Sequence, residues 1–248
     1  MDFKSWEQWE KRPDQAERTL IDRAIGNLPE MESTKQLVKL VSEVYRDGDR
    51  VLDVGCNVGH YLKGLRKKFP KLDYTGVDAY SHYIDQAKKI FSDDDKSHFE
   101  VKNIFEPISP ENSYDVVFCC NVLLHFPDFR KPVKNLLGST KKVCFIRLLL
   151  DDFTSIVQLT YENKFDENGN PLDFRYYNTW SKKYFIDFIH GLKYNVELIK
   201  DEFDPSVLDY ESKNVKTKEF DKGTRIIDGK QVIDNIITNY VWAKITPI

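Results

Sequence analysis

The segment from Val51 to His60 constrains the fold of this chain more than any other part of the sequence. It reads Val-Leu-Asp-Val-Gly-Cys-Asn-Val-Gly-His: a short apolar strand with a carboxylate near its end, a tight turn of small residues, and the beginning of a helix. In an open α/β sheet, such a unit leaves backbone N–H groups free and the surface open where the strand stops. We therefore expect a nucleoside-containing ligand to bind at this turn.

Length and composition limit the class of protein. The 248 residues suffice for one α/β domain with insertions, or at most for two small domains. Hydrophobic residues make up 41% and charged residues 31%, as in soluble globular proteins with a buried core. The net charge of −3 gives no general attraction to polyanions and so disfavours a nucleic-acid substrate.

Neither a membrane segment nor a metal site is expected. The longest apolar run, Val143–Leu150, is interrupted by Arg147 and is too short to span a bilayer. The chain shows no charged-then-apolar leader, so we expect a cytoplasmic protein without a membrane partner. The cysteines lack metal-ligand spacing, and we expect them to be reduced, buried thiols: Cys56, Cys119, Cys120 and Cys144.

Between residues 50 and 150, strand-like and helix-like segments alternate. The continuous apolar run Val116–Cys120 is typical of a parallel sheet that is covered on both faces. The predicted strands are Arg50–Val54, Asp73–Val77, His98–Lys102, Tyr114–Cys119 and Lys142–Leu149. The predicted helices are Tyr61–Lys68, Ser81–Phe91 and Phe129–Leu137.

The two flanks follow other patterns. Residues 1–49 are predicted to form a helical extension, with one amphipathic helix around Leu37–Val44 and earlier helical segments that include Trp6 and Trp9. After residue 150 the alternation is lost. We expect a hairpin or lid with its turn at Asn168–Pro171, a helix over Trp180–Gly191 capped by Thr179 or Ser181, and a strand over Tyr194–Ile199. We also expect a hairpin at Asp228–Gly229 and a strand over Ile236–Ile245.

The turn at Gly55–Gly59 does not fit a dinucleotide site. The dinucleotide fingerprint needs three glycines, but Asn57 stands where the second is expected and no third one follows. Asn tolerates left-handed backbone better than most residues, so the turn itself survives. Asp78, at the end of the second predicted strand, is placed to accept hydrogen bonds from both hydroxyls of a ribose. These features favour a nucleoside cofactor other than a nicotinamide dinucleotide.

Four motifs between Val51 and Leu150, about 40% of the chain, resemble those of class I S-adenosylmethionine-dependent methyltransferases in order and spacing. They are Val51–Gly59, Tyr74–Asp78, Val101–Phe105 and Ser113–Asp128, with Asn103 where the family more often has Asp. The resemblance implies a Rossmann-like, doubly wound, mostly parallel sheet of seven strands with the last strand antiparallel. It also implies a methyltransferase domain over residues 50–248, with a cofactor half (50–150) and an acceptor half (151–248) that begins with a lid-like insertion after the fifth strand.

The resemblance also implies a cofactor, S-adenosylmethionine, and the residues that bind it. The turn would approach the methionine part of the cofactor, Asp78 would hold the ribose, and residues on two further loops would border the adenine. The implied cofactor-binding residues are Asp53, Gly55, Cys56, Asn57, Gly59, Asp78, Ala79, Tyr80, Asn103, Ile104 and Asn121.

Two histidines have competing interpretations. His125 stands where the family commonly has His near the transferred methyl group, and a general base is one interpretation. A histidine at the start of a helix with a satisfied hydrogen bond is the other. His60 directly follows the turn, and we expect it to be a solvent-edge or packing residue.

The expected function is methyl transfer to a small-molecule or glycan acceptor. Residues 121–124 lack the Asn/Asp-Pro-Pro-Tyr signature, which argues against methylation of DNA bases or of protein glutamine. An RNA methyltransferase and a non-catalytic regulatory protein that binds S-adenosylmethionine remain alternatives. The aromatic residues after 150 suit either an acceptor-binding lid or the core of an α+β extension. The oligomeric state stays open.

Overall fold

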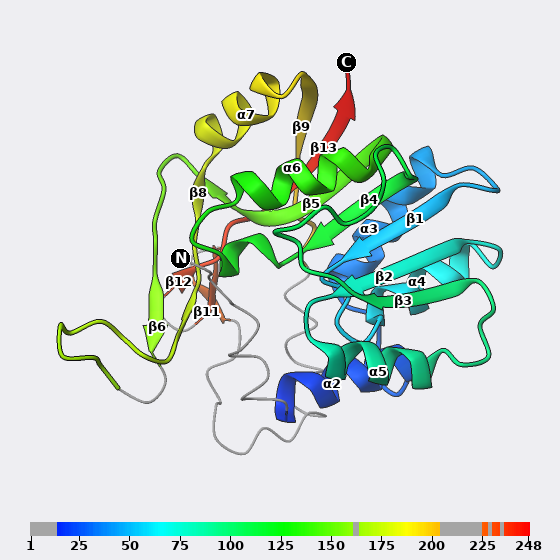
Figure 1. The fold of residues 1–248 in the computed structure, drawn as a ribbon, viewed down its shortest axis with the longest axis horizontal. Helices are drawn as coiled ribbons and strands as arrows, with labels where there is room; N and C mark the ends of the chain where they lie inside the picture. The colour runs from blue at the N-terminus through cyan, green and yellow to red at the C-terminus, as the bar shows by residue number, and fades with distance from the viewer. Residues whose placement is uncertain (1–13, 161–163, 204–224, 228–229, 234–235) are drawn as a thin grey trace.

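A twisted central sheet organises the computed structural model, which describes residues 14–160, 164–203, 225–227, 230–233 and 236–248 (Figure 1). Its strand order is β3-β2-β1-β4-β5-β13-β9, and a short eighth strand, β8, pairs with β5. The strands are β1 (Arg50–Val54), β2 (Asp73–Asp78), β3 (Ser97–Val101), β4 (Tyr114–Cys120), β5 (Thr140–Asp151), β8 (Trp180–Ser181), β9 (Tyr194–Lys200) and β13 (Tyr240–Pro247).

The sheet is parallel except at β13, which runs antiparallel to both of its neighbours, β5 and β9. The order reverses beside β1, whose two neighbours β2 and β4 are both parallel to it. In open α/β sheets, ligands bind outside the carboxyl ends of the strands at such a switch point. The expected doubly wound sheet with an antiparallel last strand is confirmed.

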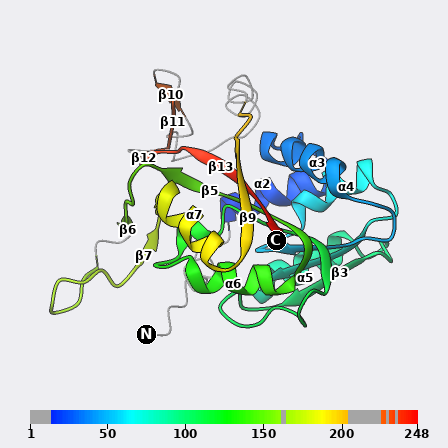
Figure 2. The same cartoon turned by 90° about the horizontal axis from the view of Figure 1, so that it is seen from above.

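Helices cover both faces of the sheet, as the views in Figures 1 and 2 show. On one face α3 (Glu32–Val44), α4 (His60–Lys68) and α5 (Ser81–Ile90) share a core with residues such as Val51 and Phe118. On the other face α6 (Arg130–Ser139) and α7 (Lys182–Gly191) pack on residues such as Leu52 and Val117. Adjacent strand residues therefore enter opposite cores, which explains why the strands are continuously apolar.

The remaining described elements are two helices and two small sheets. The helix α2 (Asp14–Ile25) packs against α4, and the one-turn helix η1 (Leu123–His125) follows β4. Two small sheets lie outside the main one: β6 (Gln158–Thr160) with β7 (Phe174–Tyr176), and β10 (Arg225–Ile227), β11 (Lys230–Ile233) and β12 (Ile236–Ile237). None of the described helices is long and apolar enough to cross a membrane.

Several boundaries differ from the sequence prediction. The single strand predicted over Ile236–Ile245 is wrong, because β12 and β13 are separate strands in different sheets. The helix predicted from Trp180 begins instead at Lys182, because Trp180 and Ser181 pair with β5. Ser181 is the cap, since its hydroxyl accepts from the Tyr184 N–H.

The two predicted hairpins are supported by strand pairing. β6 pairs antiparallel with β7, and β10 pairs antiparallel with β11. Trp6, Trp9 and the Asp228–Gly229 turn lie outside the described residues.

Candidate active site

The turn after β1 has the left-handed backbone that its small residues predict. The φ angles are +80° at Gly55, +50° at Asn57 and +78° at Gly59. The Asn57 side chain supports this conformation, because its Oδ1 accepts the Val58 N–H at 2.8 Å. Asn therefore replaces glycine here without loss of the turn.

The expectation of free N–H groups in this turn is wrong for residues 55–59. The N–H groups of Gly55 and Cys56 both donate to the Val77 carbonyl, at 2.8 and 3.0 Å, and the Gly59 N–H donates to the Cys56 carbonyl. The N–H of Asn57 donates to the Asp78 carboxylate at 3.0 Å. Because these N–H groups donate to β2 and within the turn, they are not available to a ligand. The small residues of the turn instead let a ligand come close to the backbone.

Gly55 leaves no room for a side chain. A Cβ at this position would collide with Cγ2 of Val122, and its φ is left-handed. We expect Gly55→Ala to lower the free energy of unfolding in urea by at least about 1–2 kcal/mol, from backbone strain alone. Gly138→Ala is the matched control, because a Cβ there meets nothing within 4 Å in a helix, where Ala is favoured by about 1 kcal/mol. Equal stability of the Gly55 variant and the wild type would contradict this account.

Asp78 ties the turn to the end of β2. Its Oδ1 accepts the Tyr80 N–H and its Oδ2 accepts the Asn57 N–H, both at 3.0 Å. Burial raises the pKa of this carboxyl, while hydrogen bonds from Tyr80, Asn57 and Ala79 oppose that rise. A carboxylate offers about four acceptor positions. The Tyr80 and Asn57 N–H groups fill two of these positions at hydrogen-bond distance, so Asp78 can accept further hydrogen bonds from ligand hydroxyls.

A cavity of about 290 Å³ opens at the carboxyl ends of β1, β2 and β4. The sequence-predicted residues that line it are Gly55, Asn57, Asp78, Ala79, Tyr80, Ile104, Asn121 and His125. The structure thus brings together six residues from four separate motifs, and Ala79 and Tyr80, which directly follow the second motif. Sequence reasoning missed Leu20 and Met31, which line the cavity from the N-terminal flank and carry no local motif.

Four of the predicted cofactor-binding residues do not line the cavity: Asp53, Cys56, Gly59 and Asn103. Asp53 is 1% exposed and accepts a hydrogen bond from the Tyr74 hydroxyl at 2.7 Å. Cys56 is fully buried, and Asn103 Oδ1 accepts the Phe105 N–H at 3.0 Å. These side chains support the strand ends and loops behind the cavity.

The buried Asp53 predicts a pH-dependent stability. Burial raises its pKa to about 8, whereas the unfolded chain releases this proton near pH 4. The group therefore stabilises the fold fully below about pH 4, and that contribution is lost as the pH rises to about 8. We expect Asp53→Asn, which does not ionise, to gain stability relative to the wild type between about pH 5 and 8 in thermal unfolding. A stability difference between the variant and the wild type that stays constant across this pH range would contradict the raised pKa of Asp53.

His125 lines the cavity as a neutral imidazole. Its Nδ1 lies 2.9 Å from the Tyr176 carbonyl oxygen, which only accepts, so Nδ1 carries the proton and Nε2 is the basic nitrogen. Burial lowers the pKa of His125 to about 4, against the opposing effect of the Tyr176 hydrogen bond. One tautomer therefore fits both interpretations of His125: Nδ1–H donates to the Tyr176 carbonyl, and Nε2 is the basic nitrogen.

His60 is not at the solvent edge. It is 8% exposed and lines the cavity at the first position of α4. Its Nδ1 has no hydrogen-bond partner among the described residues, and burial, followed by the charge of Arg23, lowers its pKa to about 3. Of the two expected roles of His60, packing fits its buried ring and a position at the solvent edge does not. The ring also borders the cavity.

The aromatic segment after β5 is split between core and surface. Tyr177, Trp180 and Phe185 are buried, whereas Phe153 and Phe165 are more than half exposed. The segment also holds η1 in place. The N–H of Asn178 donates to the Leu124 carbonyl, and its side-chain amide donates to the Phe126 carbonyl, both at 2.8 Å.

The four cysteines are buried and unpaired, as expected. Within the described part of the chain, no three His, Cys, Asp or Glu side chains gather as metal ligands would.

Known proteins resemble this chain in the same region. A family model described as "Methyltransferase domain" matches residues 52–144. Residues 52–144 of the chain are therefore a methyltransferase domain. The matched residues include β2, β4, most of β1 and every described lining residue of the cavity except Leu20 and Met31.

Curated relatives match this methyltransferase domain at moderate identity. A tRNA U34 carboxymethyltransferase of Campylobacter curvus is 31% identical over 140 residues, which are 54% of this chain and 43% of that protein. A malonyl-[acyl-carrier protein] O-methyltransferase of Priestia megaterium is 32% identical over 91 residues, 37% of this chain and 32% of that protein. The chain thus spans less than half the length of these relatives.

A solved structure shares the fold. The magnesium protoporphyrin IX methyltransferase of Synechocystis, with bound S-adenosylmethionine, has a TM-score of 0.54 at 12% identity. The match covers 88% of this chain and 79% of that one.

S-adenosylmethionine is the cofactor of the domain, and the cavity suits it. Asp78 retains acceptor positions for the ribose hydroxyls, and the apolar side chains of Ala79 and Ile104 suit adenine. Aromatic rings of Tyr61 and Phe126 also line the cavity, and aromatic faces attract a sulfonium cation. The individual residue assignments remain predictions.

Proposed function

We propose that the chain transfers a methyl group from S-adenosylmethionine to a small-molecule or glycan acceptor, with His125 as the base. The observation that carries this proposal is the position of His125, which lines the same cavity as Asp78 and is held with Nε2 as its basic nitrogen. Bound S-adenosylmethionine supplies an electrophilic methyl group. The protein then has to align the acceptor and to take a proton where the acceptor carries one.

The chain's own residues supply these functions. Asp78 binds the ribose hydroxyls, and the Tyr176 carbonyl fixes the imidazole of His125. The proton released by a hydroxyl or amine acceptor moves to Nε2 of His125. The Tyr61, Tyr80 and Phe126 side chains around the cavity exclude water from this position.

The lining of the cavity supports a small acceptor. Among the described lining residues Lys102 is the one Lys or Arg, and most of the other side chains in this set are apolar or aromatic. A nucleic-acid site normally displays a cluster of basic residues, because phosphate contacts supply much of the affinity. An RNA acceptor is the second candidate, since one relative is named a tRNA carboxymethyltransferase.

The acceptor class is tested with S-adenosylmethionine labelled on its methyl group. The purified protein is incubated separately with small-molecule, glycan and RNA fractions of a cell extract. We expect label to enter the small-molecule or glycan fraction. Label in RNA alone would establish the second candidate, and cofactor binding without label in any fraction would indicate a non-catalytic regulatory protein.

A further inference from the structure

Arg147 is a buried charge at the centre of a polar network beside the cavity. It lies on β5 and is 5% exposed. Its Nε and Nη2 each donate to the Asp201 carboxylate at 2.7 Å, and its Nη1 donates to Asn121 Oδ1 at 2.6 Å. Its guanidinium carbon lies 3.8 Å from the centre of the Tyr240 ring. The ion pair neutralises the charge and leaves one arm of the guanidinium to hold Asn121.

The contact with Arg147 determines which way the Asn121 amide points. A guanidinium only donates hydrogen bonds, so the amide atom that faces it is the oxygen. The Asn121 N–H also donates to the Arg147 carbonyl at 3.0 Å, and Asn121 has a left-handed φ of +60°. Both its backbone and its side chain are therefore held, and Nδ2 with its two donors is the end left for the cavity that Asn121 lines.

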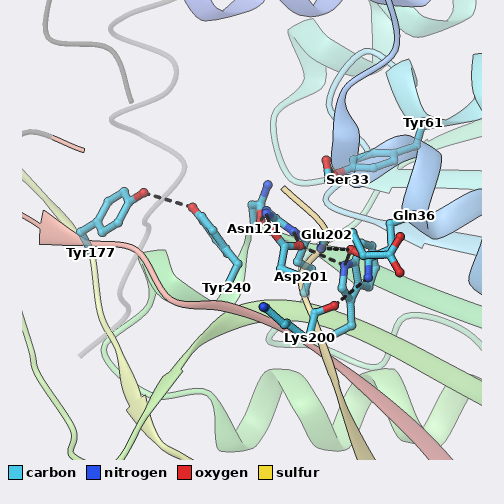
Figure 3. Close-up of polar contacts among 11 residues, drawn as sticks. Ser33, Gln36, Tyr61, Asn121, Tyr177, Lys200, Asp201, Glu202 and Tyr240 are labelled. Carbon is cyan, nitrogen blue, oxygen red and sulfur yellow. Dashed lines mark hydrogen bonds and ion pairs between the residues drawn. The ribbon is translucent and has the colours of Figure 1, made fainter. Parts of the chain in front are cut away.

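The partner of Arg147 is held in turn by a second set of hydrogen bonds, drawn in Figure 3. Trp242 Nε1 donates to Asp201 Oδ1 at 3.2 Å and to Gln36 Oε1 at 2.8 Å. Gln36, on α3, also donates to the Lys200 carbonyl at 2.8 Å. Asp201 is thus fixed between the end of β9, β13 and an N-terminal helix. Removing one partner of a buried ion pair is strongly destabilising, because the other charge stays buried without compensation.

The order of the strands places the side-chain amide of Asn121 at one end of the cofactor site. Asp78 ends β2, the Gly55 turn follows β1, and Asn121 follows β4, in the spatial order β2-β1-β4. A ligand whose ribose binds Asp78 and which crosses the turn reaches Asn121 with its opposite end. In S-adenosylmethionine that end is the amino acid, whose carboxylate only accepts hydrogen bonds.

We propose that Arg147 is a positioning residue that holds Asn121 as a hydrogen-bond donor to the carboxylate of the bound S-adenosyl amino acid. This inference rests on the cofactor assignment above. Asp201 holds Arg147 in the required orientation, and neither charged residue touches the ligand. Asn121 contributes the two N–H groups of its amide.

The test compares two nucleosides that differ in the amino acid part, S-adenosylhomocysteine and 5′-methylthioadenosine, by calorimetry. Asn121→Asp keeps an acceptor for Arg147, so the fold is retained, but it replaces both donors with a negative charge. Arg147→Lys keeps a charge for Asp201 but does not bridge to Asn121. We expect each variant to bind S-adenosylhomocysteine at least about tenfold more weakly, the effect of losing a charged hydrogen bond. Methylthioadenosine affinity should stay within about twofold.

A loss of affinity for S-adenosylhomocysteine but not for methylthioadenosine distinguishes a positioning role from general structural damage. Equal weakening of both nucleosides, or unchanged binding of both in either folded variant, would overturn the proposal. If Arg147→Lys does not fold, the Asn121→Asp result decides. A wild-type protein that binds neither nucleoside would refute the cofactor assignment instead.

Discussion

Asp78→Ala is expected to weaken S-adenosylhomocysteine binding by about 1–3 kcal/mol, roughly 5- to 150-fold in dissociation constant. The substitution removes the carboxylate that is positioned for the ribose hydroxyls. It also removes the acceptor for the Asn57 and Tyr80 N–H groups, which secure the turn against β2. Isothermal titration of the folded variant measures the change directly.

Asp73→Ala is the matched control for this substitution. Asp73 is the first residue of the same strand, so it lies at the amino end of β2, away from the cavity at the carboxyl end. Its side chain is 42% exposed. We expect the Asp73→Ala variant to bind S-adenosylhomocysteine with the affinity of the wild type. Unchanged binding in a folded Asp78→Ala protein would remove Asp78 from the ribose site.

His125→Asn is expected to lower kcat by about 10²- to 10⁴-fold, the usual contribution of a general base. The Asn amide reproduces the donor at Nδ1 and so keeps the hydrogen bond to the Tyr176 carbonyl, but it supplies no basic nitrogen. Cofactor affinity should therefore stay at the wild-type value. Activity is measured on the fraction of cell extract that takes up the labelled methyl group. Wild-type activity in this variant would show that His125 is a structural residue.

The same role predicts an unusual pH profile. The base must be neutral, and burial lowers the pKa of His125 from 6.5 to about 4. The neutral form therefore persists well below the pH at which an ordinary histidine becomes protonated. We expect kcat/KM to stay constant from neutral pH down to about pH 5 and to fall with a midpoint near 4. An acidic midpoint near 6.5 would contradict the buried environment.

The parts of the fold that the sequence predicted well are those with regular periodicity. The apolar runs of β1 and β4 enter two cores at once, which leaves a continuous hydrophobic pattern. The motif residues Asp78, Asn121 and His125 were found because each ends a strand or lies shortly after one. Strand ends at a switch point converge in space, so local patterns there report a shared site.

The parts that the sequence missed depend on contacts between distant segments. Nothing near Met31 signals that it lines the cavity, and nothing near Asp201 signals that it pairs with Arg147. The free N–H groups expected in the turn are used because Val77 and Asp78 accept them from the neighbouring strand. Such long-range pairing has no signature in one short stretch of sequence.

A crystal structure of the protein with S-adenosylhomocysteine tests the central claim most directly. We expect the nucleoside over the Gly55 turn, with both ribose hydroxyls within hydrogen-bond distance of the Asp78 carboxylate and the amino acid part toward β4. Density for the ligand at another place, or a cavity that stays empty at saturating ligand, would contradict the assignment of this cleft as the cofactor site.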